Sequence, residues 1–193
     1  MEIVELLIDE ESDSFNGIDA ISIVTHPAIE AHGVMLSKDQ KSMFAKETEE
    51  KGIFIAPILK PDKLIYREKE NGDPYQVYFS KDTIRKCAEQ FMMESRQWQM
   101  TEQHEKAVNE ICLVESWIVE DPELDKSKIY NLDVNNGTWC GVFRINNEDV
   151  KTKLKSGELQ GISIEGYFTD KIETSLEKEI INTVAELAKK GDI

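Results

Sequence analysis

The sequence predicts a mainly β protein of the α+β class, with about six to eight strands in a partly closed β-barrel and two or three helices decorating it. Most apolar residues fall in short runs rich in Ile, Val, Phe and Tyr, and turn residues separate these runs. Only a few segments show the helical period. The chain of 193 residues, 40% of them hydrophobic, is long enough for one domain with a substantial core.

Two strands are expected near the N-terminus. The run EIVELLIDEE alternates at first and then becomes acidic, which suits an initial strand. The run GIDAISIV is rich in β-branched residues and precedes His26-Pro27, where proline favours an extended backbone in the residue before it. The stretch 38–51 is polar and lacks a sustained apolar face, which predicts a linker, with a short helix as the alternative.

A compact β-rich region is predicted to begin at Gly52. The run IFIAPIL is a short apolar strand, and KLIYREKENGDPYQVYF contains two β-type runs joined across Asn71-Gly72-Asp73-Pro74, a strong hairpin signal. A helix is then expected from Ser80 or Asp82, because both residue types cap helices. Its buried stripe is predicted to consist of Ile84, Cys87, Ala88, Phe91 and Met92.

The C-terminal half is expected to form strands over ICLVESWIV, GTWCGVFRI and GISIEGYF. A short helix precedes the last of these strands. Its start carries Glu148 and Asp149, which suit the positive end of the helix dipole, and Gly157 suits its C′ position. A final helix over LEKEIINTVAELAKK follows Thr174 and Glu177, which resemble a capping box.

We therefore expect one domain with four segments. Residues 1–37 would be an N-terminal strand segment that packs on the barrel, and residues 38–51 a polar linker. Residues 52–171 would form the β-barrel core. Residues 172–193 would form an amphipathic C-terminal helix, whose apolar stripe would be buried on the barrel or against another subunit.

The charge balance argues against two classes of partner. The net charge is −15, with 38 acidic and 23 basic residues spread along the chain, whereas nucleic-acid binding needs a local excess of Lys and Arg. No apolar run approaches the roughly 20 residues that span a bilayer. The acidic start lacks the features of a signal peptide. We expect no nucleic-acid or membrane partner, and a protein that is not secreted.

Cysteine and histidine give little support for a metal or cofactor site. Cys87, Cys112 and Cys140 form no C-x-x-C pair, and each lies in an apolar pattern, which predicts buried free thiols. His26 precedes proline and His32 precedes glycine, so both are expected in loops. We therefore expect no metal and no cofactor.

A serine is an effective nucleophile only when a nearby base accepts its proton, and histidine is the usual base. His104, in the stretch TEQHEKAV, is the one histidine of the β-rich region, although an ordinary surface histidine is the alternative. The candidate serines are Ser116 in LVESWIV and Ser163 in GISIEG. Glu115 lies beside Ser116. Glu165 is expected on the same face of the strand as Ser163.

The strand around Ser163 has its own pattern. Ile162 and Ile164 are predicted to face the core, so Ser163 lies on the opposite face. Gly161 and Gly166 would leave room for a substrate or an oxyanion to approach. A serine in a strand is more often structural, and the absence of a G-x-S-x-G motif removes support for an α/β-hydrolase.

Several stretches together resemble the XkdF-like serine protease domain of tailed bacteriophages. The resemblance extends from Met1 to about Thr169, and its motifs follow the family's order. The stretches are AISIVTHPAIE, GDPYQVYFSKDTI, TEQHEKAV, VESWIVEDPELDKSKIY and GTWCGVFRINNEDVKTKLKSGELQGISIEGYF.

The resemblance implies a prohead protease that is related in fold to the herpesvirus assemblin proteases. Such enzymes use a serine and a histidine in a β-barrel, and the matching motifs make His104 the histidine and Ser163 the nucleophile. Glu115, in VESW, is the first choice for the third catalytic residue, and Glu165 is the alternative. Gln103 stands where many relatives would carry a carboxylate before the histidine.

The resemblance also implies a function. The expected activity is that of a serine endopeptidase, which cleaves the viral scaffold and major capsid protein, and itself, through an acyl-enzyme. It would act in the host cytoplasm inside the immature capsid, as a homodimer or a larger assembly. The alternative is a non-catalytic capsid-assembly or scaffolding module with the same fold. A third hypothesis is an unrelated β-barrel binding protein in which the two residues lie far apart.

Overall fold

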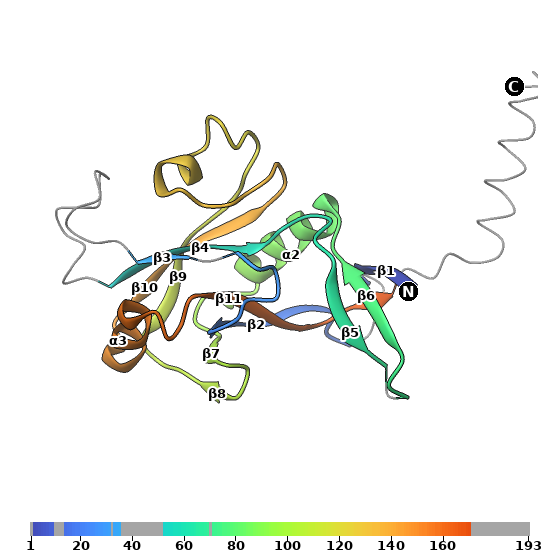
Figure 1. The fold of residues 1–193 in the computed structure, drawn as a ribbon, viewed down its shortest axis with the longest axis horizontal. Coiled ribbons are helices and arrows are strands. Elements are labelled where there is room, and N and C mark those ends of the chain that lie inside the picture. The colour runs from blue at the N-terminus through green and yellow to red at the C-terminus, as the bar shows by residue number, and fades with distance from the viewer. Residues whose placement is uncertain (1, 10–13, 32, 36–51, 70, 171–193) are drawn as a thin grey trace, which may run out of the picture.

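The computed structural model describes residues 2–9, 14–31, 33–35, 52–69 and 71–170 (Figure 1). This part of the chain contains two α-helices, one 3₁₀ helix and twelve strands. The helices are α2 (Lys81–Met93) and α3 (Glu148–Ser156), and the 3₁₀ helix is η1 (Lys126–Tyr130). The predicted mainly β, α+β class is confirmed.

The strands form three open sheets of four strands each, and the described ranges contain no closed barrel. This differs from the expected partly closed barrel and from its strand count. Several strands have only two residues, namely β3 (Val34–Met35), β8 (Lys106–Ala107) and β12 (Thr169–Asp170). Strands this short carry too little alternating pattern to be predicted, and they end before they could pair around a ring.

The first sheet has the order β11-β2-β7-β8. Its other strands are β11 (Gly161–Tyr167), β2 (Gly17–Val24) and β7 (Met100–Glu102). β2 lies between β11, to which it is antiparallel, and β7, to which it is parallel. The register aligns Ser163 of β11 with Ser22 of β2, and Ser22 with Thr101 of β7. Figure 1 shows β11 and β2 side by side across the molecule, with the β7–β8 hairpin at one edge.

The second sheet has the antiparallel order β3-β4-β10-β9. Its longer strands are β4 (Ile53–Leu59), β10 (Trp139–Ile145) and β9 (Ile111–Ile118). Every residue of β4 is buried because its two faces meet two cores. Phe54, Ala56 and Ile58 belong to the main core. Ile53 and Ile55 belong to a second core, which they form with residues of the segment 119–134 between β9 and β10.

The third sheet has the order β12-β1-β6-β5. Its strands β1 (Glu2–Leu7), β5 (Ile65–Glu68) and β6 (Pro74–Tyr78) complete the fold. The predicted hairpin across Asn71–Pro74 is confirmed, with β5 antiparallel to β6. The β5–β6 hairpin projects from the body of the molecule in Figure 1.

The two helices begin and end where local signals predict. The side chain of Ser80 accepts a hydrogen bond from Thr83 N and caps α2. Of the predicted stripe, Ile84, Cys87, Ala88 and Phe91 are buried, and Met92 is half-buried. α3 ends at Gly157, whose φ of 78° is the left-handed conformation expected at this position.

The linker 38–51 and the C-terminal helix 172–193 were predicted for residues outside the described ranges. The division into four segments therefore stays a prediction. In the part of the chain that the structure describes, no helix has the length and apolar character needed to cross a membrane.

The three cysteines are free and buried, as predicted. Burial raises the pKa of the Cys87 thiol to about 12, and it also raises the pKa of Cys140 and of Cys112. At neutral pH these thiols stay protonated and neutral, so none of them is an activated nucleophile.

Alkylation tests this environment. With iodoacetamide at pH 8, Cys87 and Cys140 should react more than about 100-fold more slowly in the native protein than in guanidinium, since only the accessible thiolate reacts. Peptide mapping by mass spectrometry gives the rate at each cysteine. Equal native and denatured rates would contradict the buried, protonated state.

Candidate active site

A polar face of the β11-β2-β7 sheet carries the candidate residues. Along β11 the side chains alternate, so the buried Ile162 faces the core and Ser163 and Glu165 lie on the other face. The hydroxyl of Thr101, on β7, donates a hydrogen bond to Glu165 Oε1. Ser22, on β2 between them, is fully buried and is aligned with Ser163. These four polar groups therefore lie together on three adjacent strands.

His104 lies at the turn that joins β7 to β8. Gln103 and His104 both have positive φ, 54° and 62°, and Glu105 N donates to Glu102 O at 3.0 Å. Two positive φ values at the centre of such a turn are typical of type I′, which normally uses Asn-Gly. For residues with a Cβ, this conformation costs roughly 1–2 kcal/mol each. The turn therefore needs contacts that hold it in place.

β2 supplies these contacts. His104 N donates to the Ser22 hydroxyl at 2.9 Å, and Gln103 N donates to Ile23 O at 3.1 Å. The Gln103 side chain accepts from Thr25 N at 3.2 Å and donates to Thr25 Oγ1 at 2.5 Å. A glutamine side chain can both donate and accept hydrogen bonds. A carboxylate, which many relatives would carry at this position, can only accept them.

An ion-pair network holds the end of β7, next to this turn. Lys153, on α3, lies 2.7 Å from Glu102 Oε1 and 2.8 Å from Asp149 Oδ2. Hydrogen bonds with Asp149 and Glu102 raise the pKa of Lys153, so it stays charged. The residue immediately before the His104 turn is therefore tied to α3.

The imidazole of His104 contacts Glu165. Nδ1 lies 3.2 Å from Glu165 Oε1, and the two side chains are 42% and 31% exposed. The same carboxylate oxygen accepts the Thr101 hydrogen bond, which restricts its position. A carboxylate at Nδ1 fixes the tautomer of a histidine and leaves Nε2 available as a base.

Ser163 is half-exposed beside this pair. Its hydroxyl forms no hydrogen bond with another described residue, whereas the neighbouring Ser22 hydroxyl accepts from His104 N. Hydrogen bonds between a nucleophile and its base are often long before a substrate binds. The structure thus brings Ser163, His104 and Glu165 to one face of one sheet.

Glu115 and Ser116 lie elsewhere, on β9 of the second sheet. The Glu115 carboxylate forms an ion pair with Lys126. The Ser116 hydroxyl accepts a hydrogen bond from Nε1 of the buried Trp139 at 2.8 Å. Of the two carboxylates predicted as the third residue, Glu165 is the one that contacts His104.

Gly161 and Gly166 of β11 were expected to leave room for a substrate, but the protein itself fills the space beside them. A Cβ on Gly161 would lie 2.7 Å from Pro27 Cγ, and a Cβ on Gly166 would lie 2.2 Å from Gly17 O. Their missing side chains therefore make room for the protein's own backbone and loop.

Ser22, Thr101 and the role of Gln103 were not predicted from the sequence. Ser22 gave one signal, since it is the single polar residue in the apolar run AISIV. Thr101 gave none, because β7 has only three residues and no pattern.

A family model described as "Putative phage serine protease XkdF" matches residues 40–173. The chain belongs to this family. The resemblance that the motifs indicated is thereby confirmed, and the matched range contains both His104 and Ser163. The match begins after β2, so Ser22 lies outside it. Searches of curated proteins and of solved structures gave no match.

The hydrogen bond that holds the His104 turn gives a stability prediction with an internal control. Ser22 and Ser127 are both fully buried, but the Ser127 hydroxyl has no hydrogen-bond partner in the described ranges. Ser22→Ala should lower the free energy of unfolding by about 1–2 kcal/mol, because His104 N loses its acceptor.

Ser127→Ala should leave the free energy of unfolding unchanged or raise it by up to about 1 kcal/mol, because an unpaired buried hydroxyl is costly. Urea denaturation followed by tryptophan fluorescence measures both values. Equal losses in the two variants would show that the Ser22 hydrogen bond adds nothing.

Proposed function

We propose that this protein is a serine endopeptidase that works through an acyl-enzyme, with Ser163 as nucleophile and His104 as general base. The observation that carries the proposal is the 3.2 Å contact between His104 Nδ1 and Glu165 on the face that Ser163 shares. Side chains two residues apart on a strand are separated by about 7 Å, which leaves room for an imidazole hydrogen-bonded on each side.

In the proposed reaction, His104 Nε2 takes the proton from Ser163 Oγ as the oxygen attacks the peptide carbonyl. The imidazolium then gives this proton to the leaving amine, and the peptide bond breaks. A water molecule attacks the resulting ester with His104 again as base, which frees the product and restores Ser163.

Glu165 is the proposed orienting carboxylate, in place of Glu115. It faces Nδ1, where a negative charge stabilises the imidazolium that forms during the reaction. The Thr101 hydrogen bond keeps the carboxylate in place. Glu115 already has Lys126 as a partner on another sheet.

The biological setting is proposed from the family. Membership in a family of phage serine proteases supports scaffold and major capsid protein as substrates, and self-cleavage as a further event. The protein would then act inside the immature capsid in the host cytoplasm. Self-association and a fold relationship to the assemblin proteases are proposed on the same ground.

One observation favours a second candidate, a non-catalytic capsid-assembly module. The Ser163 hydroxyl forms no hydrogen bond with His104. The contact of 3.2 Å between His104 Nδ1 and Glu165 favours the enzyme, because a carboxylate at this nitrogen orients an imidazole for base catalysis.

Processing of the natural partners separates the two candidates. When the chain is produced with its cognate scaffold and major capsid protein, intact-mass analysis should give fragments that disappear with Ser163→Ala and with His104→Ala. Identical masses in wild type and Ser163→Ala would favour the assembly module.

The third catalytic residue is tested by matched amide variants. Glu165→Gln should slow processing about 100-fold or more, because the imidazolium loses its countercharge. Glu115→Gln should stay within about threefold of wild type, since it alters only a partly exposed ion pair. The reverse ranking of the two rates would assign the role to Glu115.

A further inference from the structure

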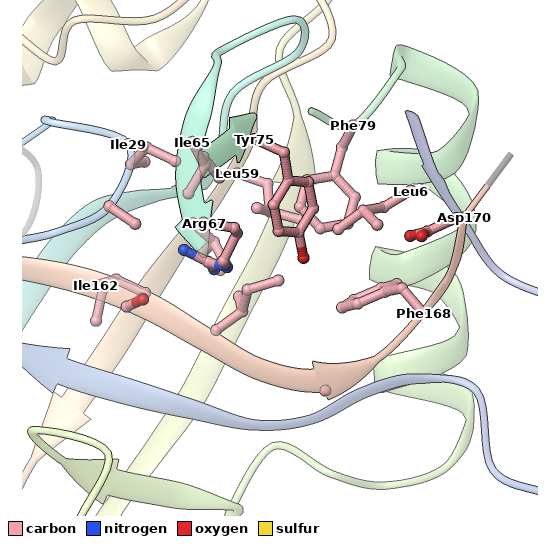
Figure 2. Close-up of a pocket in the computed structure, with 15 residues that line it drawn as sticks. Leu6, Ile29, Leu59, Ile65, Arg67, Tyr75, Phe79, Ile162, Phe168 and Asp170 are labelled. Atoms are coloured by element: carbon pink, nitrogen blue, oxygen red, sulfur yellow. The ribbon is translucent and has the colours of Figure 1, made fainter. Parts of the chain in front are cut away.

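A cavity of about 240 Å³ lies between β11 and the β5–β6 hairpin (Figure 2). Ile162 and Ile164 of β11 line it, and Ser163, between them in the strand, also borders it. Most of its other walls are apolar, and they come from all three sheets and the segments next to them. They include Leu6, Ile29, Leu59, Ile65, Phe79 and Phe168.

Two polar side chains reach over this cavity from the hairpin, Arg67 of β5 and Tyr75 of β6 (Figure 2). Arg67 has no acidic partner among the described residues, and its Nη1 donates to Tyr66 O at 3.0 Å. Asp170 also lines the cavity, but Figure 2 places it at the other end, beside Phe168.

The strand β11, which borders the cavity, is an edge strand. β11 pairs only with β2 among the described strands. The loop that contains Pro27 covers the Gly161 end of β11, whereas the strand becomes more exposed from Ser163 onward. A peptide added to such an edge as an extra strand would direct alternate side chains to the two faces of the sheet.

We infer that this cavity takes one bulky apolar side chain of an extended peptide, and that Arg67 binds a carboxylate two residues along the peptide, on the same face of the added strand. The inference rests on the proposed function, because it makes the peptide the substrate of Ser163. An apolar cavity of about 150 Å³ can hold benzene, so this one admits a phenylalanine or leucine side chain. Arginine binds carboxylates in a two-point geometry that a lysine does not offer.

Binding to an inactive protein tests the inference apart from catalysis. The probes are synthetic ten-residue peptides with a central Phe, Leu, Ala or Lys, each made with an Asp or a Lys two residues away. The protein carries Ser163→Ala, alone or together with Arg67→Glu. Arg85→Glu is the matched control, because Arg85 is an exposed arginine of α2 outside the cavity.

Peptides with Phe or Leu two residues from Asp should bind more than about 10-fold tighter than their Ala or Lys counterparts. Arg67→Glu should abolish the preference for Asp and keep the preference for Phe or Leu, and Arg85→Glu should change neither. Absence of binding by every peptide, or equal effects of the two arginine variants, would overturn the inference. Scaffold processing by the wild-type protein tests the proposed function separately, because it does not depend on which peptides bind.

Discussion

The candidate site depends on the pairing of β2 with its two neighbours. β2 pairs with β11 on one side and with β7 on the other, and this places Ser22 between Ser163 and Thr101. The same strand anchors the His104 turn through Ser22 and Ile23. If β2 moved by one residue, its polar and apolar faces would exchange, and the turn would lose its anchor. Every contact within the site follows from this register.

The candidate site has a buried anchor and side chains that solvent can reach. Ser22 is fully buried and fixes the backbone of a strained turn, whereas the imidazole and Ser163 remain partly open to solvent. Beside β11 lies an apolar cavity with Arg67 above it. One edge strand thus carries Ser163 and Glu165, and it also borders the cavity proposed to take a substrate side chain. This arrangement gives the proposed peptidase a route to specificity.

Local signals predicted much of the fold, and long-range pairing explains the rest. The Asn71–Pro74 hairpin, the Ser80 cap and the Gly157 terminus depend on neighbours in sequence, and each is confirmed. The motifs predicted Ser163 and His104 as partners. The sequence could not rank Glu165 above Glu115, because the choice depends on which strands share a sheet. The parallel pairing of β2 with β7 joins residues about 80 positions apart and leaves no local pattern.

The central claim is that Ser163 is a nucleophile activated by His104. Treatment of the full chain with a fluorophosphonate, followed by peptide mapping, tests it most directly, because this reagent traps activated serines. We expect one adduct, at Ser163, that is lost with His104→Ala and formed much more slowly with Glu165→Gln. An adduct at Ser116, or an unmodified protein, would contradict it.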